Sequence, residues 1–338
     1  MEPAPLFADV ADGPDNGAAW WQTTDDGVRL RIALWPTSDA RGTVLLFPGR
    51  TEYIEKYGRT ARDFAQRGYA TLVIDWRGQG LADRLTADAM SGHVLRFSDY
   101  QKDVAAMMEA AKTLDLPRPW HLLGHSMGGC IGLRALSQGL PVRSCAFSGP
   151  MWGIQIAPTL RPLAWSLSWS SRYMGASHRY APGTDAENYV LTEPFESNKL
   201  TNCPDMYQYM IDQALAHPEL GLGGPSLSWL YEALRETRNL RYAPSPELPC
   251  LTVLGTREEI VCPRRIGHRM SVWPGARLEL VEGGRHEVLM DAPDMRRRVM
   301  DAICDLFDAP AAGKSALAST DRAPRTVAAG QASRSPAP

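Results

Sequence analysis

Residues 124–129 have the sequence GHSMGG and contain the pattern G-x-S-x-G, with Ser126 at its centre. A serine hydroxyl is a weak nucleophile at neutral pH, so it must be presented to a base. A sharp turn from a strand into a helix does this, and it requires small residues beside the serine. An apolar run precedes this turn and a small-residue helical pattern follows it, which predicts Ser126 as a nucleophile. A purely structural tight turn is the alternative interpretation.

His286 is the strongest candidate for the general base among the seven histidines. It lies in residues 281–291, VEGGRHEVLMD, a glycine-rich loop after the last expected strand. A base on such a loop can reach the strand edge where Ser126 is expected. His125 lies inside the turn itself and is expected to point away from Ser126. A surface loop histidine is the alternative interpretation of His286.

A carboxylate is needed to hold the imidazole in the correct tautomer and to stabilise its charged form. In this type of fold the acid comes between the serine and the histidine in chain order. Residues 256–261, TREEIV, follow an apolar run and contain Glu258 and Glu259. We expect Glu258 to be the acid, with Glu259 as the alternative.

Acyl transfer also places negative charge on a carbonyl oxygen, and each fixed N–H donor aimed at it contributes roughly 3 kcal/mol. The backbone N–H of Met127, directly after the nucleophile, is the first expected donor. The second is the backbone N–H of Arg50, in the loop after the apolar run 43–47. The sequence leaves open whether the Arg50 side chain contacts substrate, and a structural Pro-Gly turn is the alternative for this loop.

Short apolar runs alternate with longer segments of helical periodicity and must position these residues. The expected strands are 28–35, 43–47, 69–75, 120–124, 144–148, 249–255 and 276–282, and the expected helices 54–66, 100–113, 127–137 and 292–308. Apolar strands that alternate with helices are typical of an α/β fold with a mostly parallel central sheet flanked by helices.

The pattern changes between the fifth and sixth of these strands, where residues 151–248 are rich in Trp, Tyr, Met, Pro and Ser. We predict a core made of residues 1–150 and 249–308, with 151–248 inserted as a helical cap, and a disordered tail at 309–338. Most large apolar residues of the cap must hold it to the core. Those expected to line an acyl-chain site are Trp152, Met206, Met210 and Trp229.

The composition argues against several kinds of partner. The net charge of −2 gives no reason to expect nucleic acid, and we see no cluster of metal ligands and no need for a cofactor. Six scattered cysteines indicate reduced thiols, and neither a signal peptide nor a membrane-spanning run is seen, so we expect a cytoplasmic protein. Transient contact with a membrane surface stays open, and the sequence does not indicate an oligomeric state.

Several of these segments resemble the lysophospholipase and monoacylglycerol lipase branch of the α/β-hydrolases, the serine aminopeptidase S33 type of domain. The matching segments are FPGRTEYIEKY (47–57), DWRGQG (75–80), GHV (92–94), FSDY (97–100), GHSMGG (124–129) and GRH (284–286). The PGR form of the loop and the glutamate pair look most like bacterial lysophospholipase L2. The resemblance covers residues 20–307 and implies hydrolysis of a fatty acyl ester of a lysophospholipid or a monoacylglycerol.

Three other functions are compatible with the same site. A peptidase of the proline iminopeptidase kind would need cap acids to bind a free amine, and Glu187, Glu193 and Glu196 are candidates. A cofactor-free peroxidase or an acyl transferase could use the same residues. A non-catalytic ligand-binding protein of the same fold is a further alternative, although every catalytic role here has a candidate residue.

Overall fold

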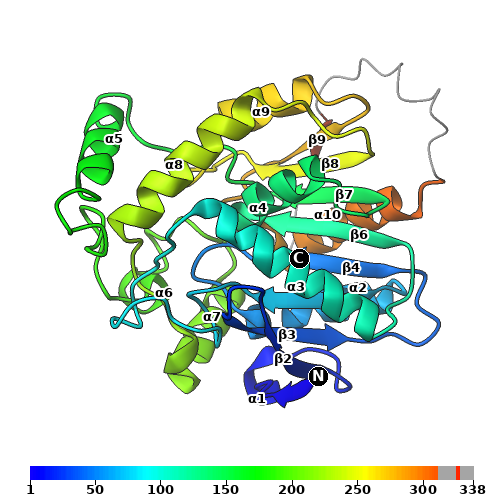
Figure 1. Ribbon diagram of the computed structural model, residues 1–338. Helices are drawn as coiled ribbons and strands as arrows, with labels where there is room; N and C mark the ends of the chain where they lie inside the picture. Colours follow the sequence, from blue (N-terminus) through cyan, green and yellow to red (C-terminus); the bar gives the residue numbers. More distant parts are fainter. Residues whose placement is uncertain (311–324, 328–338) are drawn as a thin grey trace, which may run out of the picture.

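The computed structural model describes residues 1–310 and 325–327 of the chain. In this part a ten-stranded sheet forms the centre of the molecule, in the order β1-β2-β3-β5-β4-β6-β7-β8-β9-β10 (Figure 1). The strands are β1 Glu2–Ala4, β2 Ala18–Thr23, β3 Arg29–Trp35, β4 Thr43–Phe47, β5 Ala70–Asp75, β6 Trp120–His125, β7 Ser144–Ser148, β8 Cys250–Gly255, β9 Arg277–Val281 and β10 Arg325–Val327.

The sheet is parallel from β5 to β10 and antiparallel only at its N-terminal side, from β1 to β5. In the parallel part β4 lies between β5 and β6, with Leu46 opposite both Val73 and Leu123. Such strands are covered on both faces, which explains why their sequences are continuous apolar runs. The predicted α/β class with a mostly parallel sheet is confirmed.

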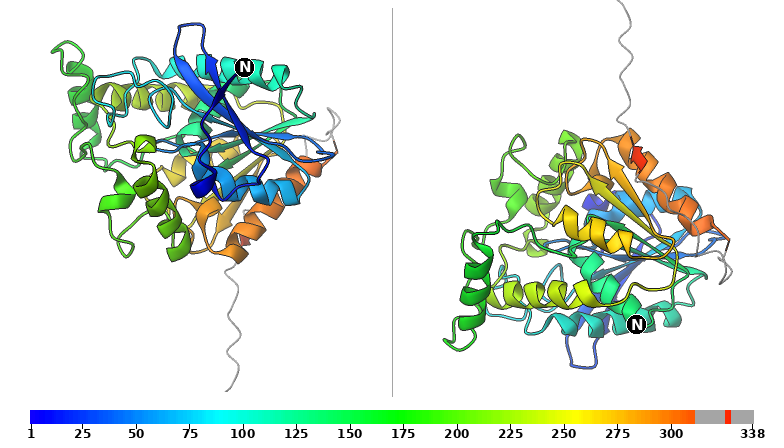
Figure 2. Two further views of the ribbon diagram at one scale, coloured as in Figure 1. Left: turned by 90° about the horizontal axis from the view of Figure 1, so that it is seen from below. Right: turned by 90° about the horizontal axis from the view of Figure 1, so that it is seen from above.

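Helices cover both faces of the sheet (Figure 2). They are α1 Ala8–Ala11, α2 Gly58–Gln66, α3 Tyr100–Thr113, α4 Ser126–Ser137, α5 Arg161–Ser170, α6 Tyr189–Thr192, α7 Pro204–Ala216, α8 Leu227–Tyr242, α9 Pro263–Ser271 and α10 Pro293–Asp308, with 3₁₀ turns η1 Ile54–Tyr57, η2 Phe97–Asp99, η3 Pro218–Leu220 and η4 Val288–Met290. The sequence predicts one helix over 54–66, whereas the structure divides it into η1 and α2.

Two apolar cores lie on opposite faces of the sheet. Along β4, Leu45 and Phe47 belong to the core shared with α3 and α4, whereas Val44 and Leu46 belong to the core shared with α2 and α10. This alternation follows from the period of two residues in a strand. The sheet is therefore held from both sides, and its carboxyl edge is a rigid base for the loops that follow β4, β6, β8 and β9.

The chain between β7 and β8 contains α5, α6, α7 and α8 and no strand. In both views of Figure 2 this green segment extends to one side of the sheet. No helix of the described residues is long and apolar enough to cross a membrane.

Most of the tail, for which the sequence predicts disorder, lies outside the described residues. Within it, the structure places Arg325–Val327 as β10, parallel to β9. An edge strand such as β9 presents unpaired backbone groups, which a further segment can bind.

Helix α4 approaches the end of β4 very closely at Gly128. A Cβ atom on Gly128 would collide with the carbonyl oxygen of Phe47, whereas a Cβ on Gly267, in α9, would meet nothing within 4 Å. We predict that Gly128→Ala lowers the free energy of unfolding by about 1–3 kcal/mol. The matched change Gly267→Ala is expected to raise it by about 0.5–1 kcal/mol, since alanine favours a helix. Urea unfolding of both variants measures this, and equal effects would contradict the close approach.

Candidate active site

Ser126 occupies a strained turn between β6 and α4. Its φ angle is +47°, in the left-handed region that residues with a side chain rarely adopt. The turn is held on its far side, where the carbonyl oxygen of Ser126 accepts a hydrogen bond from the Met151 amide at 2.8 Å. Strained backbone of this kind persists where the surrounding structure fixes it, and it is concentrated at functional sites.

His286 lies in the loop between β9 and η4 and is paired with Glu258, which follows β8. His286 Nδ1 and Glu258 Oε2 are 2.7 Å apart, and both residues are buried. The other oxygen of Glu258 accepts hydrogen bonds from the amides of Ile260 and Val261. Contacts within the loop after β8 and between it and the loop after β9 therefore fix the carboxylate and the imidazole relative to each other.

The surroundings of Glu258 favour its charged form. Burial by itself would raise the pKa of this carboxyl group, but the hydrogen bond and charge of His286, together with the two amides, outweigh it and lower the pKa below its usual value. Gly149, at the end of β7, allows this pair to form. A Cβ atom there would lie 3.2 Å from His286 Nδ1 and 3.3 Å from Glu258 Oε2. No motif in the sequence marks Gly149 as part of the site.

Glu259 differs from Glu258 in every respect that matters for a buried acid. Its side chain is 64% exposed, and its nearest cation is Lys199, with Nζ 3.8 Å from Oε2. Of the two glutamates, the described contacts pair Glu258 with His286 and leave Glu259 beside Lys199. The geometry thus favours Glu258 as the partner of His286.

Two backbone amides are available beside Ser126. Met127 is the second residue of α4, and the first N–H groups of a helix have no partner inside it. The Arg50 amide has no acceptor among the described residues, and the next residue, Thr51, has a φ of +65°. The Arg50 loop is held by Trp76 and Gln79, which donate to the carbonyl oxygens of Pro48 and Gly49 at 2.9 and 2.8 Å.

A cavity of about 380 Å³ opens over Ser126 and lies between the core and the segment that joins β7 to β8. Ser126, His286 and Arg50 line it, together with Met210 and Trp229 of the residues predicted to bind an acyl chain. Much of the wall is apolar, with Met151, Ile154, Val190, Leu200, Leu230, Ile260 and Val261.

Trp152 and Met206 do not line this cavity, which corrects the prediction for these two residues. Trp152 packs against Phe147 and Trp273, and its indole N–H donates to the carbonyl oxygen of Gly129. Met206 is buried, with its sulfur beside Arg59. Both hold α4 or α7 to the core, a packing role that composition does not separate from ligand binding.

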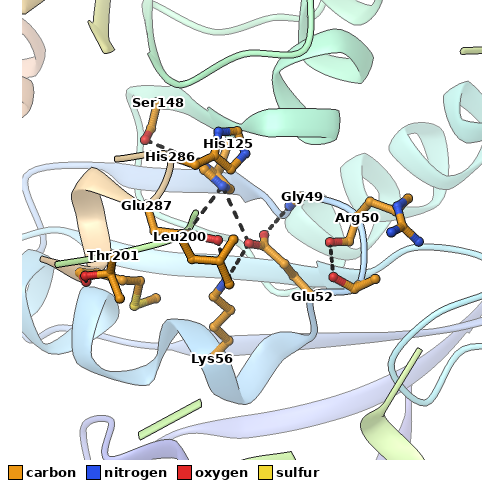
Figure 3. Close-up of polar contacts among 12 residues, drawn as sticks. Gly49, Arg50, Glu52, Lys56, His125, Ser148, Leu200, Thr201, His286 and Glu287 are labelled. Carbon is orange, nitrogen blue, oxygen red and sulfur yellow. Dashed lines mark hydrogen bonds and ion pairs between the residues drawn. The ribbon is translucent and has the colours of Figure 1, made fainter. Parts of the chain in front are cut away.

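A buried charge cluster of Glu52, Lys56, His125 and Glu287 forms part of the cavity lining. Figure 3 shows the contacts among these four residues. Lys56 Nζ is 2.6 Å from one oxygen of each glutamate. His125 Nε2 is 3.4 Å from Glu287 and 3.6 Å from Glu52. Glu52 also accepts hydrogen bonds from the Gly49 amide and the Tyr57 hydroxyl, which ties the cluster to the Arg50 loop.

The sequence predicts that His125 points away from Ser126, but its ring centroid lies 4.8 Å from that of His286. Burial alone would lower the pKa of His125, whereas the charges of Glu287 and Glu52 outweigh this and raise it. Glu52, His125 and Glu287 are residue types that bind metal ions, and one atom of each lies within 4.8 Å of the others. In this arrangement the Lys56 ammonium lies between the two carboxylates and supplies the positive charge. The i, i+4 spacing of Glu52 and Lys56 was the available sequence signal.

A parallel sheet with a serine turn after β6 and a histidine loop after β9 defines an α/β-hydrolase. A family model described as serine aminopeptidase, S33, matches residues 38–293. The chain belongs to this family, and the predicted resemblance is confirmed.

Curated relatives include two bacterial proteins of similar length. The chain is 30% identical to the probable lysophospholipase L2 of Haemophilus influenzae, over 81% of this chain and 86% of the relative. It is also 30% identical to lysophospholipase L2 of Escherichia coli K12, over 84% and 85%. Among solved structures, a soluble variant of monoglyceride lipase from Saccharomyces cerevisiae superposes with a TM-score of 0.67 at 19% identity, over 85% of this chain and 94% of that one.

The two glutamates after β8 provide a matched test of the acid. We predict that Glu258→Gln lowers kcat on an ester substrate by roughly 10³- to 10⁴-fold, because the amide cannot stabilise the imidazolium and can hold the wrong tautomer. Glu259→Gln, with an exposed side chain, is expected to leave kcat close to the wild-type value. Steady-state kinetics on a chromogenic ester measure both, and a larger loss in Glu259→Gln would reverse the assignment.

The buried charge cluster predicts a second, thermodynamic effect. Lys56→Met leaves two buried carboxylates without their cation and is expected to lower the free energy of unfolding by about 3–5 kcal/mol. Lys112→Met removes an exposed pair with Glu109 and is expected to change it little. Urea unfolding curves of the two variants make the comparison. Similar stabilities would show that the carboxylates do not depend on Lys56.

Proposed function

We propose that this protein cleaves a fatty acyl ester of a lysophospholipid or a monoacylglycerol, with Ser126 as nucleophile, His286 as base and Glu258 as acid. The observation that carries the proposal is the cavity, in which Ser126 and the Glu258-paired His286 open onto a largely apolar wall. The relatives named lysophospholipase L2 support the same substrate class.

The proposed reaction has two steps. His286 Nε2 accepts the hydroxyl proton of Ser126 while the serine oxygen attacks the ester carbonyl. The amides of Met127 and Arg50 hold the negative oxygen of the tetrahedral intermediate. The C–O bond to the alcohol breaks, and His286 returns the proton to the leaving alcohol. Water, deprotonated by His286, then attacks the acyl-enzyme and releases the fatty acid and free Ser126.

The cavity wall suits a hydrocarbon chain. Each methylene group buried there contributes about 0.8 kcal/mol to binding. Met210 and Trp229 reach the cavity from α7 and α8, and methionine and aromatic side chains adapt well to flexible apolar ligands. We further propose that residues 151–248 act as the cap of this site, since α7 and α8 contribute these residues from outside the core.

An aminopeptidase would need a free carboxylate to bind the amine of its substrate. Glu187, Glu193 and Glu196, the predicted candidates, do not line the cavity. The carboxylates that do line it are Glu52 and Glu287, and both are paired with Lys56. The distribution of charge therefore favours an ester over a peptide with a free amino terminus.

The test is a set of initial rates for wild type and Ser126→Ala. The substrates are p-nitrophenyl esters with acyl chains of increasing length, a monoacylglycerol, a lysophosphatidylcholine and a prolyl arylamide. We predict ester hydrolysis that increases with chain length and falls by roughly 10⁴-fold or more in Ser126→Ala. Circular dichroism of the variant controls for folding.

Three outcomes would contradict the proposal. Turnover of the arylamide without the esters would indicate a peptidase. Ester hydrolysis that survives in Ser126→Ala would exclude this serine as the nucleophile. Binding of the lipids with no turnover by the folded wild type would indicate a ligand-binding protein.

A further inference from the structure

Three lysine or arginine side chains line the cavity within the described chain, namely Arg50, Lys56 and Lys199. Lys56 lies between Glu52 and Glu287, with 2.6 Å to each. Lys199 is half exposed and lies beside Glu259. For Arg50, no carboxylate within salt-bridge distance is present among residues 1–310.

The Arg50 guanidinium lies against the cap. Its Nη1 donates to the carbonyl oxygen of Gly223 at 2.8 Å, and its Cζ lies 5.6 Å from the centroid of the Trp229 ring. In Figure 3 the side chain extends away from Glu52, so it does not belong to the buried charge cluster. Neighbours of this region, Pro225 and Trp229, line the same cavity as Ser126.

A guanidinium has five N–H donors, and the described residues supply one hydrogen-bond acceptor for Arg50. Burial lowers the pKa of Arg50 to about 10, so the group stays charged at neutral pH, and no carboxylate of residues 1–310 forms a salt bridge with it. A partly buried cation in this state gains most from an anion that accepts two parallel hydrogen bonds, which phosphate does.

We propose that Arg50 forms a phosphate subsite, which selects a lysophospholipid over a neutral monoacylglycerol. The inference rests on the proposed ester hydrolysis and specifies its substrate. In a lysophospholipid the acyl ester and the phosphate lie at opposite ends of one glycerol unit. The Arg50 backbone amide faces the ester oxygen in the proposed mechanism, and its side chain extends to Gly223 of the cap, where the head group binds.

A purely structural role is the competing explanation, because the Gly223 contact also joins the Arg50 loop to the cap. Such a latch would affect all substrates alike, since loss of the loop position weakens the oxyanion hole for any ester. A phosphate subsite instead affects only substrates that carry the anion. The ratio of two specificity constants therefore separates the two roles, because any common loss cancels in the ratio.

The experiment compares 1-palmitoyl lysophosphatidylcholine with 1-monopalmitoylglycerol in the same detergent micelles. The variants are Arg50→Met, Arg50→Lys and, as a matched control, Lys199→Met. The control removes a cation of the same cavity that is paired with Glu259. For each, kcat/KM is measured on both lipids. A second measurement, the binding of dodecyl phosphate and of dodecanol by calorimetry, requires no turnover.

We expect Arg50→Met to lower the ratio of kcat/KM for the lysophospholipid over the monoacylglycerol by about 10- to 100-fold, mainly through KM. Arg50→Lys keeps the charge but not the two parallel donors, so an intermediate ratio is expected. Lys199→Met should leave the ratio within about threefold of wild type, since its charge is exposed and paired. Dodecyl phosphate should bind more weakly to Arg50→Met, and dodecanol should not.

Equal losses on both lipids would overturn the inference and indicate a latch. Unchanged kcat/KM values on both lipids would also overturn it. Wild type that cleaves only the monoacylglycerol would also overturn it, while the proposed ester hydrolysis would stand. If neither lipid is cleaved, the proposed function fails. In that case the calorimetric preference of wild type for dodecyl phosphate, lost in Arg50→Met, would still support an anion subsite, and its absence would refute one.

Discussion

The hydrogen bond between His286 and Glu258 is the interaction on which the arrangement of the site depends. It joins the loop after β9 to the loop after β8, and it forms in a buried place where an unpaired carboxylate would be costly. The two amides at Ile260 and Val261 add to this, so the pair is oriented and the Glu258 carboxylate is held in its charged form. The parallel sheet contributes by bringing the carboxyl ends of β6, β8 and β9 to one edge.

The same requirement, that buried charges be neutralised, explains the floor of the cavity. Glu52 and Glu287 are held by Lys56, and His125, the fourth member of this cluster, lies beside His286. The hydrogen bonds that Glu52 accepts from the Gly49 amide and the Tyr57 hydroxyl extend this rigidity to the loop that carries the Arg50 amide. The Arg50 loop and the loop that carries His286 are thus connected through buried charges, and they are not separate surface loops.

The rest of the cavity wall is less charged than this floor. The side formed by the segment between β7 and β8 is largely apolar. The cations that line the cavity differ in the partners that they contact. Lys56 is fixed by two buried carboxylates, whereas the Arg50 guanidinium donates to one acceptor, the carbonyl oxygen of Gly223. If Arg50 binds the head group as proposed, substrate selection depends on the few residues where the core meets the segment between β7 and β8, in keeping with a fold that supports many activities through its loops.

The sequence by itself determined the sheet class, the serine turn and the histidine loop, and it limited the acid to two adjacent glutamates. These features depend on local patterns and chain order. Only the tertiary structure decided what depends on contacts between distant segments. It placed Met210 and Trp229 at the cavity but Trp152 and Met206 in the packing between elements. The structure also places His125 next to His286. The direction of this side chain depends on the backbone geometry and on the packing of the sheet, which the adjacent residues in the chain do not reveal.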